Sequence, residues 1–295
     1  MQLSITNLFK TYPNGVKALN GVSLEISKGM FGLLGPNGAG KSSLMRTVAT
    51  LQEADQGTIT LGEIDVLKQK DSVRRMLGYL PQEFGVYPKI TAETLLNHLA
   101  VLKGIHHKNE RKEIVQALLH KTNLYEHRKK NLGGYSGGMK QRFGIAQALL
   151  ANPSLIIVDE PTAGLDPAER NRFYNLLSEL GEQAIVILST HIVDDVKELC
   201  TDMAIINRGE VLYKGNPRQA ITLLEGKVYR KIILKEELDM YKQEYNVIAE
   251  KFLLGKPIIH ILSDTHPTNG FESIPTDLED VYFSHIFGNL STLAN

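Results

Sequence analysis

The chain has 295 residues, of which 42% are hydrophobic and 22% charged, enough for one large domain or a large and a small one. Lysine plus arginine equals aspartate plus glutamate at 33 each, so the net charge is zero and gives no support to a nucleic-acid binder. The single cysteine, the lack of a secretory signal and the lack of an apolar run of about 18 residues predict a cytoplasmic chain.

The first sixty residues predict short strands separated by turns. Partly alternating or wholly apolar runs place strands at 2–9, 16–26, 30–34 and 57–62. Pro13-Asn14-Gly15 predicts a turn between the first two. The pattern becomes helical from Ser42 to Leu51, directly after a glycine-rich segment.

The middle of the chain predicts helices followed by buried strands. Apolar residues recur at helical spacing between Thr91 and Tyr125, around a polar connector at 106–112. A further helix is expected from Ser136 to Ala151. Two apolar strands, 155–159 and 184–189, then flank a helix at 167–180. Strands that alternate with helices favour a mostly parallel sheet covered on both faces.

The character of the chain changes near Gly215-Asn216-Pro217. The remaining residues predict strands at 227–234 and 257–262 and helices at 235–251 and 276–287. Residues 216–295 are therefore expected to form a small appended α/β unit.

The segment between the third strand and the first helix matches the phosphate-loop pattern G-x-x-x-x-G-K-[ST]. It consists of Gly35, Pro36, Asn37, Gly38, Ala39, Gly40, Lys41 and Ser42, followed by Ser43. Glycines let successive N–H groups surround a phosphate, and the helix directs its positive end at the same charge. Lys41 adds a positive charge, and the Ser42 hydroxyl can bind Mg²⁺. A chance glycine-rich turn is the alternative, but this loop follows an apolar strand and opens a helix, so we expect a nucleotide site.

Asp159 and Glu160 follow the apolar run Leu155–Val158, at the strand end where open α/β sheets bind ligands. Asp159 can hold Mg²⁺, directly or through water, and Glu160 can act as a general base on the attacking water. Two acidic residues that cap the next turn are the alternative. Beside a phosphate loop, the catalytic interpretation is favoured.

The stretch Tyr135–Arg142 contains Ser136-Gly137-Gly138 at the start of a helix, which makes a second anion site. With this motif the chain resembles the nucleotide-binding subunit of an ATP-binding cassette (ABC) transporter, whose signature lies just before the acidic strand. The resemblance implies ATP and Mg²⁺ as ligands. It also implies a head-to-tail dimer, in which Ser136–Gly138 of one copy closes on the ATP of another copy or a homologous cassette.

The other family motifs follow the same order. Gln82 resembles the Q-loop glutamine, which contacts Mg²⁺ and the attacking water, and Asp166 ends the D-loop 163–166, which touches the opposite subunit. His191 resembles the H-loop histidine that contacts the γ-phosphate, although a lone histidine after a strand is usually structural. Tyr12 resembles the aromatic residue that stacks on adenine, although a strand-edge tyrosine is common.

Two residues depart from the usual signature: Tyr135 stands where leucine is commonest, and Met139 where glutamine often stands. The run Met139–Arg142 looks most like drug-export and sodium-export cassettes. Leu278-Glu279-Asp280-Val281-Tyr282 resembles the L-E-D-V-F stretch that closes many of those subunits. A plain amphipathic helix is the alternative for that stretch.

The resemblance implies an α/β P-loop NTPase of ABC type over residues 1–215, with an antiparallel β subdomain and a helical subdomain at about 83–150, and an accessory region at 216–295. It implies ATP hydrolysis that powers a separate membrane permease, with export expected. The chain would then be peripheral on the cytoplasmic face of the membrane, and the permease would contact Glu83–Thr94. Alternatives are an importer or lipoprotein-extraction cassette, a soluble cassette ATPase acting on DNA or ribosomes, and a nucleotide sensor that does not hydrolyse ATP.

Overall fold

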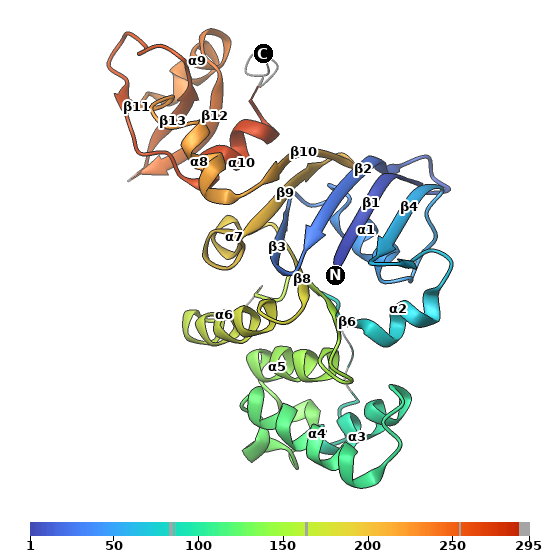
Figure 1. The fold of residues 1–295 in the computed structure, drawn as a ribbon. Helices are drawn as coiled ribbons and strands as arrows, with labels where there is room; N and C mark the ends of the chain where they lie inside the picture. The colour runs from blue at the N-terminus through green and yellow to red at the C-terminus, as the bar shows by residue number, and fades with distance from the viewer. Residues whose placement is uncertain (83–84, 86, 163–164, 254, 289–295) are drawn as a thin grey trace.

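A computed structural model of the chain describes residues 1–82, 85, 87–162, 165–253 and 255–288. The strands of this part form three sheets (Figure 1). The first, here the antiparallel sheet, has the order β2-β1-β4-β5. Its strands are β1 (Gln2–Thr11), β2 (Lys17–Ser27), β4 (Gln56–Leu61) and β5 (Ile64–Asp65).

The second, here the central sheet, has the order β10-β9-β3-β8-β7-β6. Its strands are parallel except β10, which runs antiparallel to β9 at one edge. They are β3 (Gly29–Leu34), β6 (Leu77–Leu80), β7 (Leu155–Asp159), β8 (Ile185–Thr190), β9 (Asp202–Asn207) and β10 (Glu210–Gly215). The predicted mostly parallel core with an antiparallel β part is confirmed.

Seven α-helices of the described chain precede residue 200. They are α1 (Lys41–Val48), α2 (Lys70–Met76), α3 (Ala92–Leu102), α4 (Lys108–Lys121), α5 (Gly137–Ala148), α6 (Pro167–Gly181) and α7 (Val193–Leu199). Two 3₁₀ turns, Tyr125–His127 and Leu132–Gly134, join α4 to α5. The connector predicted at 106–112 is wrong from Lys108 onward, because α4 begins there. Short elements such as α2, α7, β9 and β10 have too little periodicity to be predicted.

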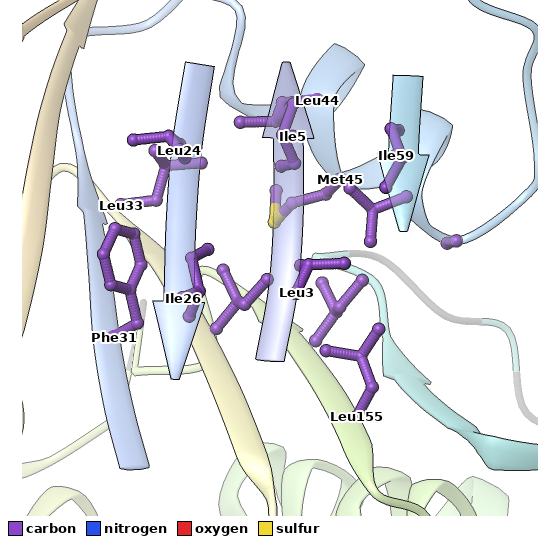
Figure 2. Packing of buried hydrophobic residues seen from close by; sticks show 14 of the residues in the cluster. Leu3, Ile5, Leu24, Ile26, Phe31, Leu33, Leu44, Met45, Ile59 and Leu155 are labelled. Carbon is purple, nitrogen blue, oxygen red and sulfur yellow. The ribbon is translucent and has the colours of Figure 1, made fainter. Parts of the chain in front are cut away.

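The central sheet is buried on both faces, and β7 shows how its sequence produces this. Successive side chains of a strand point to opposite faces. Leu155 and Ile157 belong to the apolar cluster that joins the central sheet to the antiparallel sheet and α1 (Figure 2). Ile156 and Val158 belong to the cluster that packs under α5 and α6. Because both faces are apolar, the only polar residues of this segment lie at its carboxyl end.

The helices α3, α4 and α5 form a separate layer, which lies in the lower part of Figure 1. Their own apolar cluster includes Leu96, Leu119 and Phe143, each with no exposed surface. This layer lies within the range expected for a helical subdomain, about residues 83–150.

After Gly215 the chain forms a third, wholly antiparallel sheet, here the C-terminal sheet, with the order β12-β13-β11-β14. Its strands are β11 (Val228–Ile232), β12 (Val247–Leu253), β13 (Lys256–Leu262) and β14 (Glu272–Ser273). The helices are α8 (Pro217–Leu223), α9 (Leu238–Glu244) and α10 (Leu278–Ile286), with a 3₁₀ turn at Lys235–Glu237.

The predicted helix at 235–251 is wrong in its second half, where β12 lies. Glu250 and Lys251 are compatible with a helix by propensity. Pairing with β13 nevertheless holds the segment extended, and it buries Ile248 and Ala249. The tertiary contact therefore overrides the local preference.

Helices α8 and α10 lie between the C-terminal sheet and the central sheet (Figure 1). One apolar cluster contains Leu278 and Val281 of α10, Val193 of α7, Leu34 of β3 and Ile205 of β9. The core thus continues across residues 215 and 216, and the boundary placed there from the sequence stays a prediction. Among the helices of the described residues, none combines the length and the hydrophobicity that a membrane span requires.

Candidate active site

The predicted phosphate loop connects β3 to α1 and depends on its glycines. A Cβ at Gly35 would lie 2.3 Å from the Ile206 carbonyl oxygen, and one at Gly40 would lie 2.3 Å from that of Ala18. Gly40 is also the N-cap of α1 with φ of 108°, so no side chain caps this helix. The first N–H groups of a helix have no intrahelical partner, so α1 presents free donors to an anion.

Lys41 places a buried ammonium in the loop. Its side chain is 6% exposed, and Nζ donates to the carbonyl oxygens of Gly35 at 2.7 Å and Pro36 at 3.2 Å. Burial lowers the pKa of Lys41, while the nearby Glu160 and Asp159 carboxylates oppose that shift. A positive charge held by carbonyl dipoles and two carboxylates is well placed to meet a phosphate.

The Glu160 carboxylate lies close to three other side chains, which come from different parts of the chain. Its Oε1 lies 2.9 Å from His191 Nδ1 and 3.9 Å from Lys41 Nζ. Gln82 Nε2 lies 3.5 Å from its Oε2. All four residues predicted to be catalytic from the sequence are therefore brought together.

The Glu160 backbone adopts φ of 48°, a left-handed conformation that non-glycine residues adopt at a cost of roughly 1 kcal/mol. Its N–H donates to the Ser189 carbonyl oxygen of the neighbouring strand at 2.8 Å. The main chain thus turns sharply at the end of β7, and the carboxylate is aimed toward the phosphate loop.

Asp159 and Ser42 supply oxygen donors beside Lys41. Asp159 is 5% exposed, and burial raises the pKa of its carboxyl group. Ser42 is exposed in the first turn of α1. With the amide of Gln82, these residues offer carboxylate, hydroxyl and amide oxygens, the donor set that suits Mg²⁺ together with phosphate oxygens. The residues present therefore fit the predicted metal.

Tyr12 lies beside Ser43, the last residue of the phosphate loop, and its hydroxyl has protein partners. It forms hydrogen bonds with Ser43 Oγ and Gln52 Oε1, both at 3.0 Å. Gln52 also donates to the Ser43 carbonyl oxygen and to Thr47 Oγ1, so it fastens the tyrosine to α1. No sequence motif pointed to Gln52. Stacking of the Tyr12 ring on adenine stays a prediction.

The remaining predicted residues form a second cluster. Ser136 caps α5 by accepting from Met139 N at 3.2 Å, and Asp166 caps α6 by accepting from Glu169 N at 2.8 Å. A Cβ at Gly138 would lie 2.7 Å from Glu169 Oε2, so this glycine allows α5 and α6 to approach. Ser136 and Gly137 are exposed. Ala163 and Gly164 of the predicted D-loop lie outside the described residues.

The two clusters are separate within one chain. Figure 1 shows α5 well away from α1. Among the described residues, no hydrogen bond or ion pair joins Ser136–Gly138 to the phosphate loop. The two helix starts predicted to bind anions, at α1 and α5, are therefore not joined by any hydrogen bond or ion pair among the described residues of one copy.

The buried carboxylate of Asp195, which the sequence analysis did not single out, bonds to two loops of the site. Asp195 of α7 is fully buried and accepts from Thr162 at 2.6 Å, Thr190 at 3.0 Å and Tyr174 at 2.5 Å. Burial, followed by the bond to Asp195, raises the pKa of Tyr174. In the sequence, an acidic residue in the first turn of a helix indicates only a favourable charge near the helix N-terminus. The network joins the segment after β7 to the His191 loop.

An Asp195→Asn substitution is expected to destabilise the fold by about 2 to 3 kcal/mol, because the amide turns a donor toward hydroxyl donors inside the core. Denaturant unfolding measures this. The matched control is Asp194→Asn at the exposed neighbouring position, which should change stability by less than about 0.5 kcal/mol. Equal stability of the Asp195 variant and the wild type would contradict the network.

Comparisons with known proteins agree with this geometry. The model of the ABC transporter family matches residues 19–163. The chain is 34% identical to the uncharacterized ABC transporter ATP-binding protein YxlF of Bacillus subtilis, over 95% of this chain and 98% of that one. It is 36% identical to the linearmycin resistance ATP-binding protein LnrL of the same species, over 76% and 72%.

Among solved structures, the dimeric post-hydrolysis state of the ATP-binding cassette MJ0796, bound to ADP and Pi, matches with a TM-score of 0.66 at 26% identity. The match covers 72% of this chain and 98% of that one. The family assignment rests on the phosphate loop, on the acidic residues at the end of β7, and on a relative that is similar along 95% of the chain. The chain belongs to the ABC transporter family, as an ATP-binding and ATP-hydrolysing cassette.

Proposed function

We propose that Glu160 is the general base of ATP hydrolysis and that Lys41, Gln82 and His191 form the rest of the catalytic group. The observation that carries this assignment is the convergence of those three side chains on the Glu160 carboxylate, at the carboxyl end of β7. A carboxylate beside a buried lysine and a histidine can accept a proton from water while the lysine ammonium stabilises charge on the phosphoryl group.

Mg²⁺ is proposed as the metal, held by Ser42, Asp159 and Gln82, and it would neutralise charge on the β- and γ-phosphates. The chain's own residues supply the remaining steps. The first N–H groups of α1 and Lys41 bind the phosphates, Gln82 and His191 orient the groups around the γ-phosphate, and Glu160 takes the proton of the attacking water.

We propose further that two copies, or one copy and a homologous cassette, close head to tail around two ATP molecules. Ser136 and Gly137 at the start of α5 are exposed, and among the described residues they form no hydrogen bond or ion pair with the phosphate loop of their own chain, which leaves them available to complete the site of another. The MJ0796 cassette, which is described as dimeric, supports this arrangement. Asp166 at the start of α6 would lie at the same interface.

The work done by the dimer is proposed to be export through a separate membrane permease, with the cassette peripheral on the cytoplasmic face. The direction is supported by the linearmycin resistance protein among the relatives, because resistance to a compound is commonly achieved by removing it. No nucleic-acid partner is expected from a chain with zero net charge.

A groove between the central sheet and the helical layer supports the permease contact. It has a volume of about 310 Å³ and is lined by residues of α1, β6, α3 and α5 or their ends, including Leu51, Tyr79, Leu99, Leu102 and Gln147. Leu102 is 71% and Leu51 56% exposed. The predicted contact segment, Glu83–Thr94, connects β6 to α3, which both line the groove. Residues 83, 84 and 86 of it lie outside the described residues. An amphipathic cytoplasmic helix of the permease suits this apolar groove.

A Leu102→Glu substitution is expected to remove the permease from the cassette and leave ATP hydrolysis by the isolated cassette within about twofold, because an exposed position tolerates a charge. Copurification from detergent-solubilised membranes measures the first effect. The matched control is Leu234→Glu, an equally exposed leucine (66%) outside the groove. Retention of the membrane partner by Leu102→Glu would exclude the groove, and the lack of a membrane partner with the wild-type chain would favour a soluble cassette.

A further inference from the structure

Helix α10 contains the Leu278–Tyr282 stretch, which the catalytic proposal leaves without a role, and it borders the active site. A cavity of about 330 Å³ is lined on one side by Pro36 and Asn37 of the phosphate loop and by His191. Its other side includes Glu279, Tyr282 and Phe283 of α10. A helix about 240 residues after the phosphate loop in sequence therefore reaches the same hollow as the proposed catalytic histidine.

The loop that carries His191 is fixed at both of its ends. On one side Thr190 ends the buried strand β8, and its Oγ1 accepts from the Ile192 N–H at 2.9 Å. On the other side Val193, which is 8% exposed, packs in the same apolar cluster as Val281 and Tyr282 of α10. His191 itself is half exposed. Its position relative to Glu160 therefore depends on how firmly α10 holds the start of α7.

Helix α10 is in turn fastened to the C-terminal sheet. Asp280 is 1% exposed, and its Oδ1 lies 2.8 Å from Nδ1 of His260 in β13. Glu279 Oε2 pairs with Nζ of Lys251 in β12 at 2.6 Å. Asp277 and Asp280 also form a reciprocal capping box at the start of the helix. Because Asp280 and Glu279 bond to β13 and β12, a shift of α10 relative to the C-terminal sheet would break both contacts.

We propose that Tyr282 and Phe283 of α10 are positioning residues for ATP hydrolysis, which hold the His191 loop against the γ-phosphate side of the site. This inference rests on the catalytic role proposed for His191. Through α10, the C-terminal sheet sets the rate of the chemical step and leaves nucleotide affinity to the phosphate loop. The region 216–295 then contributes to ATP hydrolysis, because its helix α10 positions the His191 loop.

Phe283→Ala is the variant that tests this proposal. Phe283 is only half-buried, so truncation leaves the core of the cluster in place. We expect kcat to fall about tenfold, because a small misplacement of a catalytic group is costly, whereas KM for ATP should stay within about twofold. Phe283→Leu restores part of the apolar contact and should recover part of kcat. The matched control, Phe252→Ala, removes a phenylalanine of β12 that is 70% exposed and does not line the cavity.

A double-mutant cycle with His191→Ala separates positioning from general damage. If α10 acts through His191, Phe283→Ala should cause no further loss of kcat in the His191→Ala background. An equal loss in both backgrounds, or an unchanged kcat in Phe283→Ala, would overturn the role of α10. Wild-type turnover by His191→Ala alone would instead remove the catalytic role of the histidine, and the inference with it.

Discussion

A Glu160→Gln variant should bind ATP as tightly as the wild type and lose at least about 10²-fold in turnover. The amide keeps the shape of the side chain but cannot take a proton from water, and general-base catalysis typically contributes that much. The hydrogen-bond partners remain available, because Gln82 and His191 lie beside the same two atoms. Steady-state ATPase assays and binding of a fluorescent ATP analogue measure the two effects separately.

The same variant should accumulate as a dimer in the presence of ATP and Mg²⁺, because closure is no longer followed by hydrolysis. Light scattering after size exclusion detects this. Adding Ser136→Glu should abolish the dimer, since a carboxylate at the exposed start of α5 would repel the phosphates of the partner's ATP. Undiminished hydrolysis by the Glu160→Gln variant would show that Glu160 is not the general base. An ATP-dependent dimer of the double variant would exclude the proposed head-to-tail contact.

A Lys41→Ala variant should weaken ATP binding about tenfold or more and reduce turnover about 10²- to 10³-fold. A charge-assisted hydrogen bond to phosphate is worth about 1.5 to 3 kcal/mol in binding, and a preorganised cation is worth more in the transition state. Lys41 can supply both because its ammonium is already enclosed by the loop, 2.7 Å from the Gly35 carbonyl oxygen.

The control for this prediction is Lys68→Ala, which removes a lysine that is 84% exposed and paired with Asp65 on the surface. An exposed pair of this kind contributes little, so binding and turnover should match the wild type. ATP affinity measured by calorimetry and thermal stabilisation by ATP provide two independent readouts. Wild-type binding and turnover in Lys41→Ala would overturn the phosphate-loop assignment.

Much of the site could be predicted because its signals are local. The Gly35–Ser43 pattern places glycine at positions 38 and 40, where φ is positive, and at position 35, where a Cβ would lie 2.3 Å from a carbonyl oxygen. The apolar run 155–158 encodes a strand buried on both faces. The start of α5 at Gly137 and of α6 at Pro167 follows from Ser136 and Asp166, which cap the next turn within their own segments. Each of these depends on chemistry within a few residues, and the structure confirmed all four elements.

The sequence was less informative where distant segments compete with local preference. Residues 247–253 carry charges compatible with a helix. They form strand β12 instead, because they pair with β13 at the edge of the C-terminal sheet. The sequence also did not indicate that the Tyr12 hydroxyl bonds to Ser43 and Gln52, while stacking of its ring on adenine stays a prediction. In both cases a contact far along the chain decided the outcome, and no periodicity records such a contact.

The sequence by itself determined which groups we propose for the site: a glycine loop, a lysine, two carboxylates, a glutamine and a histidine, each near the end of an apolar strand or the start of a helix. Only the tertiary structure decided that Gln82 and Glu160, 78 residues apart, lie within 3.5 Å, that Asp195 ties the loops beneath them, and that α10 reaches the cavity beside His191. The reason is physical. Backbone geometry and capping act over a few residues, whereas the meeting of side chains depends on how parallel strands align and on which faces must be buried together.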